Sequence, residues 1–349
     1  MNKTKARTLI VDFGMHYKQI EHCNYFLGRE NSTILPEKAL SVLDKSTFFS
    51  IYTFKKYLQL NLLYQSLIYL IKGHRVVYLT GPEYGKGIKL FIVRCLWFSL
   101  MAFYGKRSSL YIKNVDVYSN NCLLKCTLKY VQEIYFESYL QKKYFLKIYP
   151  HLEYKSRVSY VYYPKEIYES RGSIITGKSK KLRVGLVGQF DARRRDYRVL
   201  IQFIEDYPDL LNEIEFWQIG RVKNDNASLK MKKELSHVVQ FKKEDYSTKE
   251  LDEMIQASDV LISFNSVDCG YDKGKGTAAF GDAICLRKPL IVPEFLSAYK
   301  EFSDFSYYYK TADCIYKLLK ERKFRNIEPS VFDRFNPDEI KKAWSNEYR

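Results

Sequence analysis

Short apolar runs alternate with longer amphipathic segments along the first half of the chain, which predicts alternating strands and helices. The predicted strands are Thr8–Phe13, Arg75–Thr80, Ser109–Lys113, Glu133–Glu137 and Val158–Tyr162, and the predicted helices are Ser46–Lys72, Ile88–Tyr104 and Tyr139–Ile148. Strands that alternate with helices form a parallel sheet covered on both faces. The first half is therefore predicted to be a Rossmann-like α/β domain.

The second half repeats this alternation. Its predicted strands are Arg183–Val187, Glu215–Ile219, Val238–Phe241, Val260–Ser263 and Leu290–Val292, with helices from about Tyr197, Asn226, Thr248, Thr277 and Ala312. A second parallel sheet with helices on both faces is expected here.

Between the halves, Ser170–Lys181 is rich in Gly, Ser and Lys and has little periodicity, which is typical of a linker. We expect residues 1–168 to form the N-terminal domain, 169–182 the linker and 183–335 the C-terminal domain. A final helix over 336–349 is expected to cross back to the first domain. The predicted fold class is α/β, with two Rossmann-like domains facing a cleft.

The stretch from Asp259 to Glu294 is the most distinctive in the chain. The apolar run Val260–Ser263 ends at the glycine-rich loop Gly270–Gly276, and a helical segment of small and apolar residues follows from Thr277. In a parallel sheet, such a loop lies at the carboxyl end of a strand, where ligands bind. The N–H groups at the start of the helix, with Lys275 in the loop, predict an anion site for phosphate.

A second basic loop follows the first predicted strand of the second half. Arg193, Arg194 and Arg195 lie between Gly188 and the next helix. Guanidinium groups bind phosphate oxygens bidentately, so this run suits a diphosphate at the mouth of a parallel sheet. The alternative is a solvated charge run, but the anion loop in the same half favours phosphate.

Two loops imitate the phosphate loop of nucleotide triphosphatases. Gly81–Gly87 and Gly270–Thr277 both have short glycine spacings, and neither has a hydroxyl residue directly after its lysine. Because that hydroxyl holds magnesium in a true phosphate loop, a kinase or ATPase is not indicated. For Gly81–Gly87, a loop that approaches an acceptor and a tight turn both stay open.

Together, these loops and the elements around them resemble the nucleotide-sugar half of GT-B glycosyltransferases. Most of the chain is similar to the family-4-type (group 1) retaining glycosyltransferases of bacterial surface-polysaccharide synthesis, including Ile134–Lys142, where Ser138 stands at the family's serine. The resemblance implies a nucleotide-diphosphate sugar as donor substrate, no cofactor, and a glycan or lipid-linked glycan as acceptor.

The resemblance also gives roles to single positions in the second domain. The family's Gly-Arg pair corresponds to Gly188-Gln189, so a neutral side chain replaces the arginine. The family's lysine on the donor diphosphate corresponds to Arg194, with Arg195 beside it.

The two glutamates that the family carries eight positions apart are half kept. The second, which binds the ribose, corresponds to Asp282, whereas the first corresponds to Gly274 and is missing. Donor identity and stereochemistry therefore stay open. The residues expected to bind the donor are Gly188, Arg194, Arg195, Lys275, Gly276, Thr277 and Asp282.

Transfer of the sugar builds negative charge on the departing diphosphate, which cations and the helix terminus at Thr277 would stabilise. An inverting enzyme also needs a base for the acceptor hydroxyl. Asp12, His16 and Asp116 lie at or just past predicted strand ends of the first half. His16 and Asp116 are the catalytic residues we expect, with His16 the first choice.

Composition adds a partner class and a compartment. Of 349 residues, 57 are Lys or Arg and 40 are Asp or Glu, giving a net charge of +17 that favours an acidic partner. No basic recognition helix or aromatic sheet motif is found, so nucleic acid is not the partner we expect. Seven scattered cysteines suit a cytoplasmic protein with reduced thiols and no metal site.

The segment Ile88–Tyr104 raises the question of a membrane. It is interrupted by Lys89 and Arg94 and is shorter than the roughly 20 apolar residues that a spanning helix needs. A buried helix of the fold is favoured. Peripheral attachment to an anionic membrane at the inner face is the alternative, because basic residues surround the segment.

The sequence thus predicts a metal-independent glycosyltransferase that uses a nucleotide sugar. Two alternatives stay open. One is a non-catalytic GT-B-fold scaffold in polysaccharide assembly, which the missing glutamate favours. The other is a basic nucleic-acid-binding protein, which the net charge favours.

Overall fold

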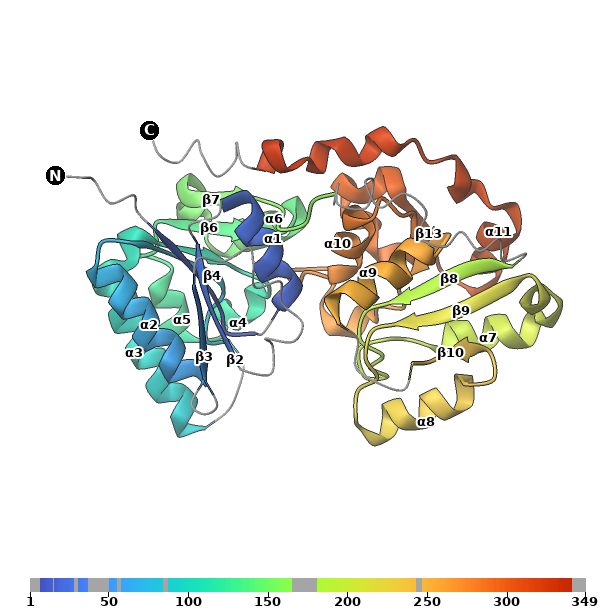
Figure 1. The fold of residues 1–349 in the computed structure, drawn as a ribbon, viewed down its shortest axis with the longest axis horizontal. Helices are drawn as coiled ribbons and strands as arrows, with labels where there is room; N and C mark the ends of the chain where they lie inside the picture. Colours follow the sequence, from blue (N-terminus) through green and yellow to red (C-terminus); the bar gives the residue numbers. More distant parts are fainter. Residues whose placement is uncertain are drawn as a thin grey trace. The chain divides into compact units, whose positions relative to one another are not determined.

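The computed structural model describes residues 7–14, 16–27, 31–36, 50–54, 58–83, 87–164, 181–242 and 247–340. The chain forms two compact units (Figure 1). Unit 1 comprises Met1–Val161, Lys273–Gly276 and Pro337–Arg349, and unit 2 comprises Tyr162–Asp272 and Thr277–Asn336. The predicted linker 169–182 lies outside the described residues except for its last two positions, and so does the predicted C-terminal helix beyond residue 340.

Unit 1 contains a parallel sheet with the strand order β3-β2-β1-β4-β5-β6-β7. The strands are β1 (Thr8–Asp12), β2 (Ser32–Pro36), β3 (Ser50–Phe54), β4 (Arg75–Thr80), β5 (Ser108–Tyr111), β6 (Glu133–Phe136) and β7 (Ser156–Val158). The helices are α1 (Tyr17–Leu27), α2 (Leu58–Ile71), α3 (Ile88–Tyr104), α4 (Val115–Ser119), α5 (Cys122–Thr127) and α6 (Tyr139–Ile148).

The prediction of a helix over Ser46–Lys72 is wrong in its first part. Residues Ser50–Phe54 form β3, which pairs in parallel with β2, and α2 begins only at Leu58. The five residues SIYTF contain β-branched and aromatic side chains that favour a pleated strand. The apolar pattern of the following helix concealed this strand.

Unit 2 contains a parallel sheet with the strand order β10-β9-β8-β11-β12-β13. The strands are β8 (Leu182–Val187), β9 (Ile214–Ile219), β10 (Val239–Gln240), β11 (Val260–Ile262), β12 (Leu290–Pro293) and β13 (Ser306–Tyr309). The helices are α7 (Arg198–Asp206), α8 (Asn226–Leu235), α9 (Thr248–Ala257), α10 (Ala278–Cys285) and α11 (Ala312–Glu321). The predicted α/β class with two Rossmann-like domains is confirmed.

The strand orders fix where a ligand fits best. In each sheet the chain leaves a central strand toward one side and returns on the other, between β1 and β4 in unit 1 and between β8 and β11 in unit 2. Loops diverge at such switch points, and ligands of open α/β sheets bind there, beyond the carboxyl ends of the strands.

The core of unit 1 is organised around Trp97 of α3, which is fully buried. Its ring lies edge-to-face against Tyr78 of β4, with 4.5 Å between centroids, and against Phe13 after β1, at 5.6 Å. The indole therefore fixes α3 on the sheet beside the switch point.

We expect Trp97→Ala to lower the free energy of unfolding by about 3–5 kcal/mol, because it empties the largest buried side-chain volume in this core. Urea unfolding of the full chain measures the change. Phe103→Ala, on the same helix but 83% exposed, is the matched control and should change stability by less than about 0.5 kcal/mol. Equal losses in the two variants would contradict this packing.

Candidate functional site

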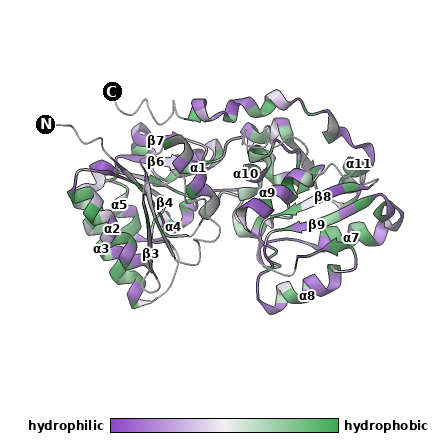
Figure 2. Cartoon of the chain, viewed as in Figure 1, coloured by the Kyte–Doolittle hydropathy of each residue, from purple (hydrophilic) through white to green (hydrophobic). Residues whose placement is uncertain are grey.

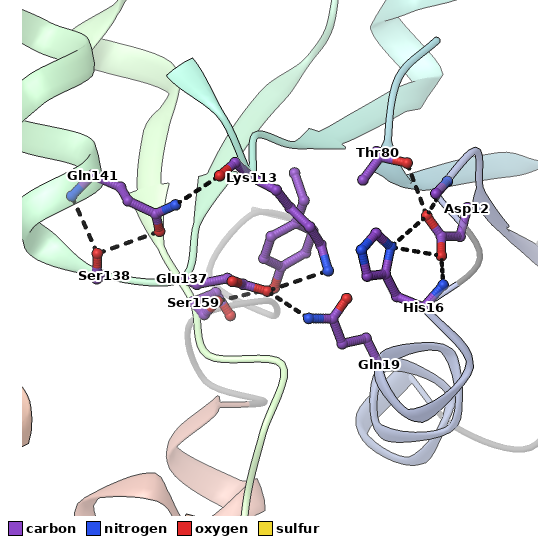
Figure 3. A network of polar contacts seen from close by, with 11 residues as sticks. Asp12, His16, Gln19, Thr80, Lys113, Glu137, Ser138, Gln141 and Ser159 are labelled. Carbon is purple, nitrogen blue, oxygen red and sulfur yellow. Dashed lines mark hydrogen bonds and ion pairs between the residues drawn. The ribbon is translucent and has the colours of Figure 1, made fainter. Parts of the chain in front are cut away.

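The carboxyl end of β1 carries a buried carboxylate, that of Asp12, which collects donors from three directions (Figure 3). Its Oδ1 accepts from the backbone N–H of Gly14 and from Oγ1 of Thr80 on β4, both at 2.8 Å. Its Oδ2 accepts from the backbone N–H of His16 and from Nδ1 of the same residue, the latter at 3.0 Å. The carboxylate thus orients the His16 imidazole at the switch point of unit 1.

The turn between β1 and α1 has the sequence that this arrangement needs. A Cβ atom on Gly14 would lie 2.3 Å from Cε1 of His16, so a side chain there would displace the ring. His16 directly precedes α1, and its carbonyl accepts the N–H of Gln19 at 3.0 Å. Glycine after the strand and histidine before the helix place the imidazole over the strand end.

The ionisation of Asp12 follows from its surroundings. Burial alone would raise its pKa, but the charge and hydrogen bonds of His16 and the charge of Lys113 outweigh burial, so the pKa lies well below its usual range. Asp12 is therefore a carboxylate, and it accepts the Nδ1 proton of His16. In the neutral form of the ring, this contact leaves Nε2 of His16 able to accept a proton from another molecule.

A second polar group in unit 1 lies where β5 and β6 end (Figure 3). Nζ of Lys113 lies 3.5 Å from Oε1 of Glu137, and Nε2 of Gln19 donates to the same oxygen at 3.0 Å. The side chains of Lys113 and Glu137 are only 9% and 12% exposed. Because water has little access to these two charges, their electric field at the strand ends is screened less than that of an exposed ion pair.

Sequence reasoning missed Glu83, the third acidic residue near these strand ends. It lies in the turn after β4 and is 5% exposed. Burial raises the pKa of Glu83 to about 8, with Asp12 adding to the rise and Tyr118 and Lys113 opposing it. Glu83 is therefore protonated at neutral pH and is able to donate a proton or hydrogen bond. The sequence feature that could have identified Glu83 as a candidate is its position in Gly81–Gly87, directly after a predicted strand.

Asp116, the other predicted catalytic residue, lies in the first turn of α4. Asn114 caps this helix by accepting the N–H of Asp116 at 3.2 Å. Oδ1 of Asp116 accepts from the hydroxyl of Tyr144 on α6 at 2.8 Å. These contacts join two helices, so they give Asp116 a structural role alongside the predicted catalytic one.

The glycine-rich loop is attached to unit 1 through Lys273–Gly276. The N–H of Gly276 donates to the carbonyl of Lys113 at 3.0 Å, and the N–H of Val115 donates to the carbonyl of Gly274 at 3.1 Å. Between them, Lys275 and Asn114 form an antiparallel bridge. Two of the predicted donor-binding residues, Lys275 and Gly276, thus lie beside the Lys113 backbone.

Both glycines of this segment lie close to other groups of unit 1, and the tighter constraint is at Gly274, which faces the Cβ atom of Val115. A Cβ on Gly274 would lie 2.7 Å from Cβ of Val115, and one on Gly276 would lie 2.5 Å from Oε2 of Glu137. Real Cβ atoms do not approach other atoms so closely. The position at which the resembled family carries its first glutamate therefore has no room for a side chain.

The switch point of unit 2 is bridged by a chain of polar side chains. The guanidinium of Arg195 donates to Oγ of Ser263 at 2.6 Å, and this hydroxyl donates to Oδ1 of Asn265 at 2.5 Å. Nδ2 of Asn265 reaches Oγ1 of Thr277 at 3.4 Å. Thr277 caps α10 by accepting the N–H of Ala279. Arg195 and Thr277, both predicted to bind phosphate, are thus brought together.

Gly188 gives this loop its shape. It follows β8 with φ +91°, a left-handed conformation that favours glycine, and a Cβ there would lie 2.5 Å from a guanidinium nitrogen of Arg195. Its carbonyl accepts from Nε2 of Gln218 at 2.7 Å. The predicted Gly188 is therefore a conformational residue that permits the position of Arg195.

The three neighbouring arginines point to different places. Arg193 is exposed, and Arg194 donates to the hydroxyl of Tyr271 and lies over its ring at 5.8 Å. Tyr271 is 1% exposed and its carbonyl accepts from Tyr299 at 2.8 Å. The structure thus holds Arg194 against a buried tyrosine and Arg195 at the switch point.

The predicted ribose ligand, Asp282, lies on α10 and is half-buried. The preceding Gly281 packs on Tyr162, since a Cβ there would lie 2.3 Å from its ring.

A cavity of about 290 Å³ lies at the carboxyl ends of β11, β12 and β13. Its polar lining residues are Asp196, Arg198, Asn265, Ser266, Asp268, Glu294 and Lys310.

No protein-family model matches the sequence, and no curated protein matches it. Among solved structures, HepE from Anabaena in complex with UDP is 10% identical, with 97% of this chain and 98% of that chain covered and a TM-score of 0.67. The UDP-forming α,α-trehalose-phosphate synthase from Burkholderia vietnamiensis is 12% identical, with 98% and 99% covered and a TM-score of 0.60.

An α-glucosyltransferase in complex with UDP-glucose and DNA containing an abasic site is also 12% identical, with 98% and 95% covered and a TM-score of 0.61. These likenesses extend over both units and almost the full length of the chain. They establish that the chain has the GT-B fold.

We expect Glu83→Gln to stabilise the protein increasingly as the pH rises from about 5 to 8. In this range the unfolded chain has lost the Glu83 proton, while the folded chain still holds it. Rising pH therefore lowers the free energy of unfolding of the native chain. Glutamine does not ionise, so the variant lacks this loss of stability. The difference should reach the order of 3–5 kcal/mol at pH 8.

Urea unfolding at pH 4, 6 and 8 measures this difference. Glu153→Gln, at an exposed position of the same unit, is the control and should show no such divergence. A constant offset between the native chain and Glu83→Gln at all three pH values would show that Glu83 ionises normally.

Proposed function

We propose that the protein is a glycosyltransferase that moves a sugar from a nucleotide-diphosphate sugar to a hydroxyl of a glycan or lipid-linked glycan. The observation that carries this proposal is the polar chain from Arg195 to Thr277 at the switch point of unit 2. A guanidinium and a helix N-terminus beyond the carboxyl ends of a parallel sheet suit the phosphates of such a donor. Structures of the same fold contain UDP or UDP-glucose, which supports this class of donor.

In this proposal unit 2 stabilises the leaving diphosphate. Cleavage of the bond between sugar and diphosphate moves an electron pair onto the leaving oxygen, and Arg195 and the N–H groups at the start of α10 are fixed donors for that charge. Asp282 accepts from the ribose hydroxyls. In this proposal, protein groups stabilise the charge without a metal ion.

Unit 1 activates the acceptor in this proposal. Asp12 holds the imidazole of His16 in the tautomer whose Nε2 takes the proton of the acceptor hydroxyl. As the proton arrives, the Asp12 carboxylate stabilises the imidazolium that forms. The acceptor oxygen attacks the anomeric carbon as the bond to the diphosphate breaks. A base in this role implies inversion of the anomeric centre.

Gly274 stands where the resembled family has a glutamate. This difference favours His16 as a base over the retaining mechanism of that family. That family is retaining and carries a glutamate at this position, whereas here packing against Val115 leaves no room for one. We propose that the chain is a GT-B enzyme similar to the family-4-type proteins in donor binding and different from them in how it activates the acceptor.

The same observation favours a second candidate function, a non-catalytic scaffold. A scaffold keeps the fold and loses the chemistry, so it would release no nucleoside diphosphate from any nucleotide sugar. Thermal unfolding in the presence of a panel of nucleotide sugars, followed by an assay of released nucleoside diphosphate, separates the two. Stabilisation by a ligand together with turnover supports the enzyme.

We expect Arg195→Ala to weaken nucleoside-diphosphate binding by roughly 1.5–3 kcal/mol, the range for hydrogen bonds to charged groups. Calorimetry with UDP and with uridine measures it, and uridine affinity should change little because uridine lacks the diphosphate. Lys320→Ala removes an exposed cation of the same unit and is the control. If uridine binding fell as much as UDP binding, Arg195 would not contact phosphate.

We expect His16→Ala to lower kcat by roughly 10²- to 10⁴-fold, the usual contribution of a general base. Affinity for the nucleoside diphosphate should be unchanged, and His151→Ala, at an exposed position, should keep full activity. The anomeric configuration of the product, read by NMR, should be inverted relative to the donor. A retained product would refute the role of His16 as the base.

A further inference from the structure

Helices α2 and α3 lie side by side (Figure 2), and they carry many apolar side chains that are exposed. Of the 14 large hydrophobic side chains that are exposed in the described part of the chain, eight lie on these two helices. We call these eight residues the apolar face: Leu60, Tyr64, Ile71, Ile88, Phe91, Ile92, Leu96 and Phe103. Such concentration on one surface marks an interaction site, because scattered exposure would not need explanation.

The apolar face is hollowed by a groove between the two helices. The groove has a volume of about 330 Å³, and Ser99 is the only residue in its lining that is neither aliphatic nor aromatic. The other lining residues are Leu60, Leu63, Tyr64, Leu67, Leu96, Leu100, Phe103 and Tyr104. Phe103 is 83% exposed at the rim, the largest exposed fraction among these side chains. A hollow lined mainly by aliphatic and aromatic side chains suits hydrocarbon.

The exposed charged residues described in the stretch that carries the apolar face have one sign. From Leu58 to Tyr111 the only acidic residue of the sequence is Glu83, and it is 5% exposed. Lys72, Lys89 and Lys106 are exposed along the same stretch. Cations at the edge of an apolar surface complement the phosphates of anionic lipids. The long side chains of lysines allow their charged ends to reach the lipid headgroups. A second copy of this face would instead bring lysines against lysines.

The helix that carries most of this face is held in the fold. Ile88–Arg107 is long and apolar enough to cross a membrane, with a mean hydropathy of 1.5, but 33% of that window is buried in unit 1. Trp97 and Met101 of α3 are fully buried in the core. To span a membrane, α3 would have to withdraw these side chains from the core. Any contact of α3 with a bilayer would therefore be made along its exposed face.

We propose that the apolar face of α2 and α3 is a docking surface for an anionic lipid bilayer. The aromatic and aliphatic side chains enter the boundary between headgroups and acyl chains, and Lys72, Lys89 and Lys106 contact lipid phosphates. The sequence segment first considered as a buried helix is therefore buried on one face and membrane-facing on the other. This inference does not rest on the proposed transferase activity, because it uses none of the candidate site residues.

Flotation of the full-length chain with vesicles tests the proposal. Vesicles of phosphatidylcholine with 30% phosphatidylglycerol (about one anionic lipid in three, a common test composition) are compared with pure phosphatidylcholine, in 0.1 M and 1 M salt. We expect recovery with the anionic vesicles at low salt, and release at high salt, where the Debye length falls to about 3 Å.

Two double variants separate the contributions. Lys89→Ala with Lys106→Ala should weaken partitioning by roughly fivefold per lysine, and Phe91→Ala with Phe103→Ala should weaken it by at least about tenfold. Tyr139→Ala with Tyr154→Ala removes two aromatic rings that are exposed elsewhere on unit 1 and should float like the native chain. Urea unfolding of each variant verifies that it is folded.

Several outcomes would overturn the proposal. One is recovery of the native chain in the soluble fraction with every vesicle and salt concentration. Another is an equal loss of flotation in the tyrosine control. A third is a dimer in sedimentation experiments that Phe91→Ala with Phe103→Ala dissociates, since the occupant of the face would then be a second copy. Because the lysine variant and the salt dependence test the same surface, misfolding of the phenylalanine variant would still leave a decisive result.

Discussion

Removing the Asp12 carboxylate from water costs several kcal/mol unless protein groups replace its hydration. Here the replacements come from the Gly14 and His16 backbone, the His16 ring and Thr80 on the neighbouring strand. Each donor fixes one part of the site, namely the turn after β1, the start of α1 and the end of β4. The orientation of the imidazole is therefore a consequence of satisfying a buried charge, and the catalytic interpretation depends on it.

A second constraint is the close approach of two backbones in unit 1. The glycine-rich segment pairs with the chain after β5, so Gly274 has no space for a side chain and one on Gly276 would displace the carboxylate of Glu137. The carbonyl of Lys113 takes part in this pairing, while its ammonium group faces Glu137. The loop that sequence patterns assign to a phosphate is thus tied to the residue whose charge lowers the pKa of Asp12. Glycine at position 274 therefore serves the close packing of the two backbones.

The sequence predicted most of the fold because periodicity reports burial, and burial repeats along strands and helices. It failed at Ser50–Phe54, where a short strand precedes a long helical pattern. In the site, residues next to strand ends could be named from order alone, as His16 was. The position of Glu83 after β4 could be named in the same way, but its raised pKa could not, because that comes from burial by distant parts of unit 1. Nor could a sequence show which of three adjacent arginines would reach the switch point, since Tyr271 and Ser263 decide that through tertiary contacts.

Helix α3 shows why composition alone could not decide its place. A core helix and a helix that lies on a membrane are both apolar, and α3 is buried on one face and both apolar and exposed on the other. The fully buried Trp97 commits one face to the sheet, whereas Phe103, six positions further on, is 83% exposed. Six residues on a helix of 3.6 residues per turn amount to about 240° of rotation, which is enough to carry a side chain from the core to the surface. A phenylalanine at such an exposed position, beside other exposed apolar side chains of α2 and α3, is the observation on which the proposed lipid contact rests.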